Sequence, residues 1–441
     1  MSCAPLAALF CLIFSFNAAQ EKAPVSVRMG FRHASAAFDR MQEKKPFFAE
    51  GGVLALNAEV AMLGGKTEAP RLNTTVDGTE IYTGRGYVGE LPEAVAEFLE
   101  SGRILLVTDA DAGETAEEIS KALKGFGFRV TERSARDGGD ADECCRLVLG
   151  AGAAEAAEAA KAAAKKLDAE CVLFPTVPCE DGLLKGGGVR AVFFDGEVLD
   201  RCPKECEAAG AGLLYALPVR RFEDCYARKI TARVVPERKQ TETVCGDRTE
   251  LAVRVLESGA EYGDGYACDR MAELLAGIAE KKGKTPRRRG EYVFLSACAL
   301  AVFYTSFLSS PAIDTLVPAD HDAALDEIAR LTGRERVNLM QAFDFFDTDV
   351  YFRINYILGE YRMDLLAELS VQDMRAAERR WRRIYDDAGY WLKSAVTARD
   401  VLDAMSLAGE LSGGLLGYAA ATGFLSVMTA GTEREEGRKS A

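Results

Sequence analysis

Histidine is almost absent from this chain, whose 441 residues include two, His33 and His321. None of the twelve cysteines forms a CxxC pair. A zinc site built from Cys and His is therefore not indicated, and we expect buried free thiols in a reducing compartment. No GxSxG motif accompanies the two histidines, which also argues against a Ser-His-Asp hydrolase.

Basic residues are outnumbered by acidic ones. The chain has 54 Lys and Arg against 68 Asp and Glu, a formal net charge of −14, and no basic domain. A nucleic-acid partner is not expected, because phosphate backbones are bound by clustered Lys and Arg. With 48% hydrophobic and 28% charged residues, the composition is that of a globular protein, and the length favours two domains.

Long hydrophobic runs are also missing. Residues 297–308 are apolar but too short to span a bilayer, so we expect no membrane partner. Residues 6–19 are similar to the core of a signal peptide, yet no Lys or Arg precedes them. The sequence predicts a cytoplasmic protein and leaves open a signal peptide at residues 1–19.

What the sequence does contain is an alternation of apolar strands and helices. Residues 153–166 are all Ala, Glu or Lys, which are strong helix formers, and they lie between two short apolar runs. Such an alternation predicts a doubly wound parallel sheet with its ligands at the carboxyl ends of the strands. The predicted strands are 79–82 (at the sheet edge), 104–108, 128–130, 147–149, 171–174 and 189–194.

After about residue 205 the strand signals fade and helical periodicity takes over. The predicted fold class is therefore α/β, with an N-terminal parallel-sheet dinucleotide-binding domain followed by an all-helical C-terminal domain. The predicted segments are an irregular N-terminal extension (1–75), an α/β nucleotide-binding domain (76–205), a helical domain (206–430) and a charged tail (431–441).

The turn at Gly150-Ala151-Gly152 follows a predicted strand and precedes the alanine-rich helix. Because glycine has no Cβ, backbone amides at Gly150 and Gly152 could approach a pyrophosphate at the helix N-terminus. A tight strand-to-helix turn that binds nothing explains the same pattern.

Two acidic residues follow predicted strands. Asp109 could accept hydrogen bonds from a ribose, or it could cap the helix that starts near Thr115. Asp181, in Glu180-Asp181-Gly182, could act on the substrate, although an acid before glycine is also ordinary turn chemistry.

These stretches resemble the glycerol-1-phosphate dehydrogenase branch of the superfamily shared by dehydroquinate synthases and iron-containing alcohol dehydrogenases. The resemblance covers about residues 77–430. Its motifs are Leu106 to Asp109 as the first nucleotide-side strand and acidic turn, Gly150 to Gly152 as the glycine triplet with Lys161 after it, Pro175-Thr176 with Asp181-Gly182, and residues 397–408 as the closing helix. It implies a cofactor, NAD or NADP, bound by Asp109, Gly150, Gly152 and Thr176.

The same family holds a divalent metal with one aspartate and two histidines, and this sequence departs from that pattern. The aspartate expected after Ala209-Gly210-Ala211-Gly212 is replaced by Leu213. His321 is similar to the first histidine, and no histidine follows it. Of the family's metal ligands only His321 therefore has a counterpart in this sequence, whereas catalytic metal sites need about three protein ligands. The other interpretation is that Asp320 caps the N-terminus of a helix and that His321 simply stands at the start of this helix.

Three functions follow from the resemblance. The first is an NAD(P)-dependent oxidoreductase of the glycerol-1-phosphate dehydrogenase type, acting on a small (phospho)polyol with Asp181 and His321 at the substrate. The second is a catalytically inactive homologue that keeps the scaffold to bind a ligand or partner. The third is a dehydroquinate synthase-like lyase, which also needs the metal. A small-molecule substrate is the expected partner, and a homo-oligomer stays open.

Overall fold

The structure is a computed structural model. It describes residues 68–99, 102–137, 145–232, 234–235, 245–262, 265–285, 287–309, 321–342, 348–369, 396–410 and 414–424. The signal peptide predicted at 1–19 and the charged tail predicted at 431–441 lie outside these residues. Contacts divide the chain into two compact units. Among the described residues, the α/β unit comprises 68–214 and 245–262, and the helical unit comprises 215–235 and 265–424, with the gaps given above.

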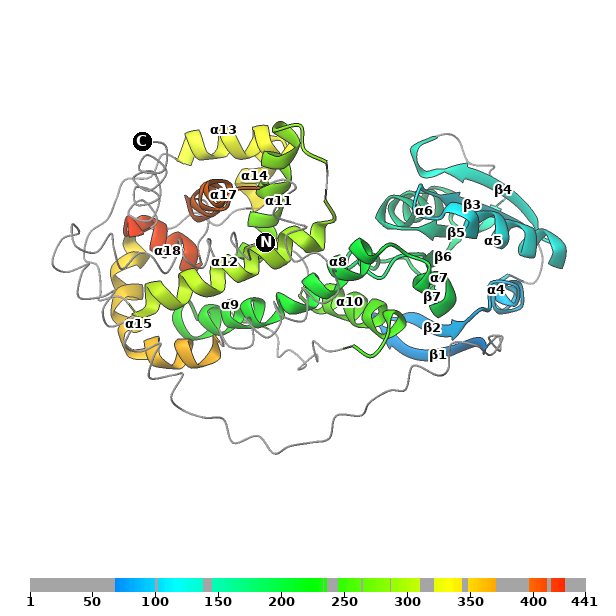
Figure 1. The fold of residues 1–441 in the computed structure, drawn as a ribbon, viewed down its shortest axis with the longest axis horizontal. Coiled ribbons are helices and arrows are strands. Elements are labelled where there is room, and N and C mark those ends of the chain that lie inside the picture. Colours follow the sequence, from blue (N-terminus) through cyan, green and yellow to red (C-terminus); the bar gives the residue numbers. More distant parts are fainter. Residues whose placement is uncertain are drawn as a thin grey trace, which may run out of the picture. The chain divides into compact units, whose positions relative to one another are not determined.

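The α/β unit is organised around one seven-stranded sheet in the order β1-β2-β7-β6-β5-β3-β4 (Figure 1). Neighbouring strands are parallel except for the antiparallel pair β1 and β2. The predicted parallel sheet is thus confirmed. The strands are β1 (Glu68–Val76), β2 (Thr79–Arg85), β3 (Arg103–Thr108), β4 (Arg129–Ser134), β5 (Cys145–Gly152), β6 (Glu170–Pro175) and β7 (Ala191–Asp195).

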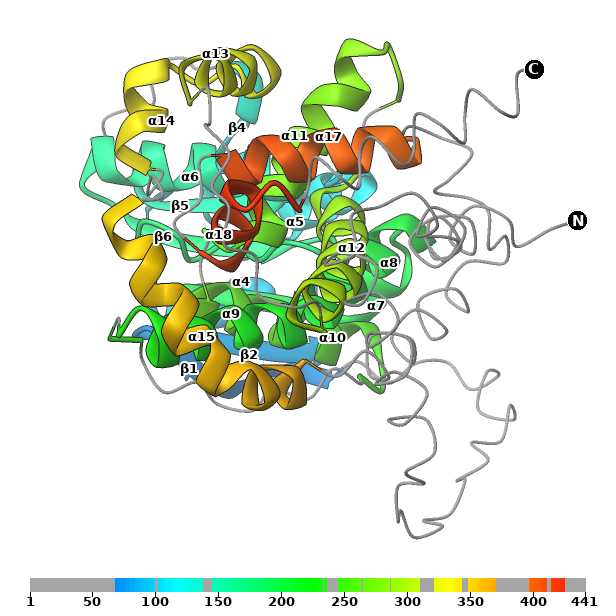
Figure 2. The same cartoon turned by 90° about the vertical axis from the view of Figure 1, so that its left-hand side faces the viewer.

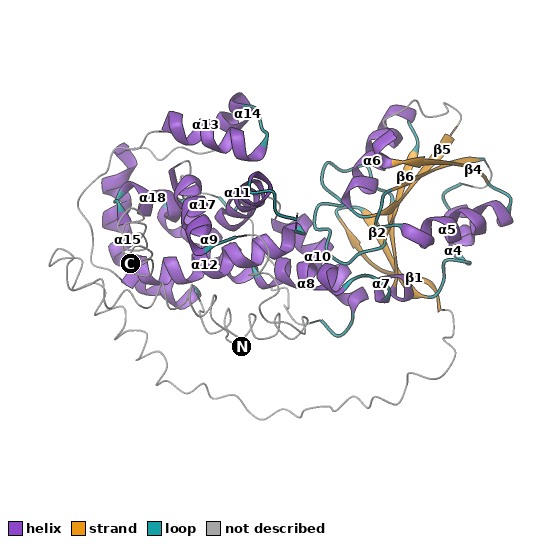
Figure 3. Cartoon of the chain, turned by 45° about the horizontal axis from the view of Figure 1, so that its top comes forward, coloured by secondary structure: helices purple, strands orange, loops and turns teal. Residues whose placement is uncertain are grey.

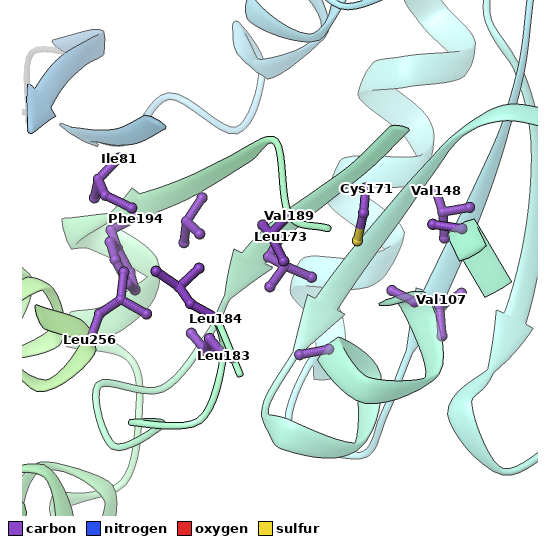
Figure 4. Close-up of a cluster of buried hydrophobic side chains, with 14 of the residues drawn as sticks. Ile81, Val107, Val148, Cys171, Leu173, Leu183, Leu184, Val189, Phe194 and Leu256 are labelled. Carbon is purple, nitrogen blue, oxygen red and sulfur yellow. The ribbon is translucent and has the colours of Figure 1, made fainter. Parts of the chain in front are cut away.

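Helices cover both faces of the sheet (Figure 3). On one face, α4 (Leu91–Ala96) and α5 (Gly113–Phe126) pack on the sheet through Leu91, Ile119 and Leu123. On the other, α6 (Ala154–Leu167) contributes small alanines and α10 (Arg248–Tyr262) contributes Leu256 to the cluster shown in Figure 4. The unit is completed by α7 (Gly196–Asp200) and α8 (Lys204–Tyr215). The sequence boundary near residue 205 differs from this division, because α8 and α10 group with the sheet.

A β-hairpin extends the sheet where the sequence predicts an irregular segment. β1 and β2 are joined by Asp77 and Gly78, both at positive φ, which is the conformation of a two-residue type I′ turn. β2 is an inner strand paired with β7, so the edge position predicted for residues 79–82 belongs to β1. The sequence pattern missed β1 because its residues are mostly polar and partly exposed, without apolar alternation.

The helical unit agrees with the predicted all-helical C-terminal part. Its described helices are α9 (Leu217–Ile230), α11 (Ala267–Lys281), α12 (Arg289–Ser309), α13 (His321–Thr332), α14 (Arg336–Ala342), α15 (Thr348–Glu368), α17 (Ala398–Glu410) and α18 (Leu415–Ala421). Within this unit α17 lies beside α11, and α15 lies beside α9 (Figure 2).

Helix α12 is the one described helix long and apolar enough to cross a membrane, with a mean hydropathy of 1.7. Of the 18-residue apolar window within α12, 83% is buried inside the protein. Buried core helices pass the same test of length and composition, so α12 is weak evidence for a membrane span. α12 is a core helix of this unit, because residues such as Phe294 and Leu300 are almost fully buried.

Candidate functional site

The sheet changes direction between β3 and β5. From β3 the chain passes through α5 to β4 on one side, and from β5 it passes through α6 to β6 on the other. Right-handed crossovers then place α5 and α6 on opposite faces and leave a gap at the carboxyl ends of β3 and β5. Ligands of doubly wound sheets bind at this switch point. Asp109 follows β3 there, and Gly152 ends β5.

The Asp109 carboxylate lies on the N-terminus of α6. Its Oδ2 accepts hydrogen bonds from the amides of Ala153, at 2.9 Å, and Ala156, at 3.0 Å. Its Oδ1 accepts the amide of Asp111 at 3.0 Å. Ala153 has no side-chain oxygen, so a carboxylate from another strand caps the helix and interacts favourably with its dipole. Of the two roles predicted for Asp109, capping is therefore observed, but on α6 and not on the helix that contains Thr115.

Gly150 and Gly152 serve different contacts. A Cβ on Gly150 would lie 2.8 Å from the Cβ of Ala160, so this glycine allows α6 to pack closely on β5. Gly152 has a φ of +141°, and a Cβ there would overlap the Asp109 carboxylate. Gly152 thus makes room for an anion at the helix N-terminus, and that anion is Asp109.

Thr176 completes this corner of the sheet. Its hydroxyl donates to the carbonyl of Asp111 at 2.8 Å, and its amide donates to the carbonyl of Gly152 at 3.0 Å. The side chain is buried. Thr176 therefore links the turn after β3 to the end of β5. The structure brings together all four predicted cofactor residues, Asp109, Gly150, Gly152 and Thr176.

This corner does not hold a dinucleotide diphosphate in its present conformation. The amides of Ala153 and Ala156, which such a group would use, already donate to Asp109. Two anions at one helix N-terminus would repel each other at short range. A diphosphate fits here only if the Asp109 side chain leaves α6.

Asp181 lies in the turns after β6, in the α/β unit. Its backbone carbonyl packs directly on Gly259 of α10, where a Cβ would overlap it. Lys161, the predicted helix lysine, donates from Nζ to the carbonyl of Lys185 at 2.8 Å, and burial lowers the pKa of its ammonium. The chemistry predicted for Asp181 stays a prediction.

The metal prediction concerns Leu213 and His321. Leu213 is almost fully buried in α8 and offers no ligand atom, and its Ala-Gly-Ala-Gly neighbours are helical. Gly210 lets α8 approach the carbonyl of Pro178, where a Cβ would overlap. His321 begins α13, but its side chain lies outside the described residues. Among the described residues no group of three or more His, Cys, Asp or Glu could hold a metal. The loss of the metal site therefore stays a prediction, and we assign no step to a metal.

Sequence reasoning missed two other polar centres in the α/β unit. Asp195 is fully buried at the end of β7 and accepts the amides of Gly86, Tyr87 and Glu197. Arg248 donates to three carbonyls at the end of α7. The signal available in the sequence for Asp195 was an acid directly after an apolar strand, the same signal as for Asp109.

The helical unit contains a buried carboxylate, Glu223 of α9. It accepts the amide of Ala267, at the start of α11, at 2.9 Å and the hydroxyl of Tyr304 of α12 at 2.9 Å. Burial raises the pKa of Glu223 to about 7, while these hydrogen bonds and the charge of Arg270 oppose the rise and Asp269 adds to it. Glu223 therefore joins three helices and changes charge near neutral pH.

We expect the helical unit to lose stability as the pH rises from about 4.5 to 7. In this window the folded state keeps the Glu223 proton, which the unfolded chain releases near 4.5. The free energy of unfolding should fall by up to about 3 kcal/mol, since one pKa unit is worth about 1.4 kcal/mol. Glu223→Gln should flatten this slope in urea titrations between pH 4.5 and 8. Equal slopes for the variant and the parent would contradict the assignment.

No protein-family model matches this chain. No curated protein matches it either.

Solved structures do match. Glycerol dehydrogenase from Schizosaccharomyces pombe is 14% identical over 72% of this chain and 93% of that chain, with a TM-score of 0.43. Sulfoacetaldehyde reductase from Bifidobacterium kashiwanohense, in complex with NAD+, is 14% identical over 82% and 99%, with a TM-score of 0.44. An iron-containing alcohol dehydrogenase from Corynebacterium glutamicum is 13% identical over 82% and 97%, with a TM-score of 0.41. The chain is thus similar to solved dehydrogenase structures at low sequence identity.

Proposed function

We propose that the chain is a dehydrogenase-type oxidoreductase that takes its nicotinamide dinucleotide, NAD or NADP, at the corner formed by β3, β5 and α6. The observation that supports this is the meeting of Asp109, Gly152 and the N-terminus of α6 at the switch point of a doubly wound sheet. A small (phospho)polyol of the glycerol-1-phosphate type is the proposed substrate class, on the motifs that the sequence shares with that branch.

In this proposal Asp109 leaves the α6 amides when the cofactor binds. The amides of Ala153 and Ala156 then donate to the diphosphate as the new anion, and Gly152 supplies the space beside them. When bound, the dinucleotide supplies hydride chemistry. The chain itself binds and orients the cofactor. No ligand for a Lewis-acid metal is assigned, because leucine stands at position 213.

Binding titrations test the proposal. Wild-type protein should bind NADH or NADPH saturably, measured by nucleotide fluorescence. Asp109→Ala should bind inorganic pyrophosphate at least about tenfold more tightly than wild type, because it removes a charge-assisted competitor worth about 1.5 kcal/mol or more.

Asp109→Asn is the matched control, since it keeps the shape of the side chain and removes its charge. Its pyrophosphate affinity should lie between those of wild type and Asp109→Ala. The proposal fails if neither wild type nor Asp109→Ala binds any nicotinamide dinucleotide saturably. If the dinucleotide binds while all three proteins bind pyrophosphate equally, Asp109 is not the competing anion.

A second candidate is a homologue that keeps the scaffold without metal-dependent hydride transfer. The observation that favours it is the burial of Leu213 where the resemblance implies an aspartate ligand. Elemental analysis separates the two candidates. Near-stoichiometric zinc, iron or nickel in wild type, lost in His321→Ala, would count against this second candidate.

A further inference from the structure

Two cysteines lie close together in the sequence at the junction of α7 and α8. Cys202 follows α7, and Cys206 lies in the first turn of α8, four residues later. The amide of Cys206 donates to the carbonyl of Pro203 at 3.0 Å, which folds the intervening residues into a tight turn. Both side chains pack in one small buried cluster, and hydrogen bonding with the Cys206 thiol is the largest cause that raises the pKa of the Cys202 thiol. The two cysteines therefore lie in the same cluster of the reduced protein.

Arg248, at the start of α10, holds this junction in place. Its Nη1 donates to the carbonyls of Leu199 at 3.1 Å, Asp200 at 2.8 Å and Cys202 at 2.9 Å. Its Nε donates to Glu207 of α8 at 2.8 Å. One guanidinium thus ties the end of α7 to the start of α8, so the two cysteines have little freedom to separate.

The same guanidinium lies beside the sulfur. The distance from Nη1 of Arg248 to Sγ of Cys202 is 3.6 Å. The hydrogen bond to Cys206 and burial raise the pKa of the Cys202 thiol, and the positive charge of Arg248 opposes that rise. A cation next to sulfur stabilises the negative charge that develops there when the thiol reacts.

The surroundings of the pair are apolar. Cys202 and Cys206 pack in a small cluster with Ala153, Val177, Cys179 and Ala209. Cys202 keeps 9% of its surface exposed, and Cys206 keeps 1%. Cys202 is therefore the more accessible of the two cysteines, and we expect a small neutral oxidant to reach it first.

We propose that Cys202 and Cys206 are a redox pair, which closes to an intramolecular disulfide when a hydroperoxide oxidises Cys202. Hydrogen peroxide converts the Cys202 thiol to a sulfenic acid and is reduced to water. The sulfur of Cys206 then attacks the sulfur of Cys202, the S–O bond breaks, and a second water leaves with the Cys206 proton. The pair loses two electrons in all, and peroxide gains them. A dithiol reductant reverses the step by thiol–disulfide exchange.

Mass spectrometry of the full-length protein tests the pair. Trypsin cleaves after Arg201 and Lys204, so Cys202 and Cys206 lie on separate peptides, 202–204 and 205–220. After peroxide treatment under native conditions these two peptides should appear joined, with a mass lower by about 2 Da than their sum. Dithiothreitol should separate them. The reduced sample should contain both peptides unlinked.

Serine variants give the controls. Cys206→Ser should abolish the link and leave Cys202 oxidised to higher acids, with a gain of about 32 Da for the sulfinic form. Cys179→Ser removes the third thiol of the cluster and should leave the link intact. Circular dichroism of each reduced variant checks that it folds. The proposal is overturned if wild-type peptides 202–204 and 205–220 stay unlinked after peroxide treatment, whether or not Cys202 is oxidised, or if Cys179 replaces Cys206 in the link.

Discussion

Alanine at position 152 is expected to lower the free energy of unfolding of the α/β unit by about 2–4 kcal/mol. Two costs combine. Gly152 has a φ of +141°, which residues with a Cβ rarely adopt. The added Cβ would also overlap the Asp109 carboxylate and push it from the amides of Ala153 and Ala156. Urea unfolding followed by circular dichroism gives the total, and hydrogen exchange of the α6 amides locates the damage.

Gly125→Ala is the matched control for this substitution. Gly125 lies near the end of α5 with nothing within 4 Å of its would-be Cβ, so alanine there should stabilise by about 0.5–1 kcal/mol. The double variant Gly152→Ala with Asp109→Ala should be less destabilised than the two single effects added, because the clash is absent. Additive effects would show that the carboxylate and the glycine do not share one space.

The second large effect is expected from Gly259→Ala in α10. A Cβ at position 259 would overlap the backbone carbonyl of Asp181. A backbone group cannot turn away as a side chain can, so α10 or the turn must shift, at a cost of about 3 kcal/mol or more. Leu256, one turn earlier, packs in the sheet cluster and resists that shift (Figure 4).

Ala260→Ser is the control, since it adds one atom at the neighbouring, half-buried position and should change stability by less than about 0.5 kcal/mol. Urea midpoints of both variants measure the difference. Equal midpoints would mean that α10 does not approach Asp181 this closely. Gly259→Ala also probes function. It should displace Asp181, and turnover should change if the Asp181 carboxylate acts on the substrate.

Much of the α/β unit can be predicted from local patterns. Apolar runs such as residues 104–108 and 171–174 mark buried strands, because both faces of a parallel sheet are covered. The Ala, Glu and Lys composition of residues 153–166 marks α6. The hairpin of β1 was missed, although Asp77-Gly78 is a strong turn signal, because β1 itself has no apolar alternation.

The candidate site could be predicted only in part. Asp109 and Gly152 each stood out as residues at strand ends, and the structure places them together. Their relation was not predictable, because the hydrogen bonds of Asp109 to α6 join residues 44 and 47 positions apart. The nearer helix, α5, was the natural candidate for capping from sequence alone. Asp195 was missed for the same reason, because its partners Gly86 and Tyr87 lie 109 and 108 positions away in the sequence.

The sequence by itself determined which segments are strands and helices, and which residue types stand at their ends. Those properties depend on neighbours within a few positions along the chain. Only the tertiary structure decided that Asp109 occupies the α6 N-terminus, because strand pairing brings the end of β3 beside the end of β5. The physical reason is that the free amides at a helix N-terminus donate to whichever anion the fold places beside them, and here that anion is the carboxylate of Asp109.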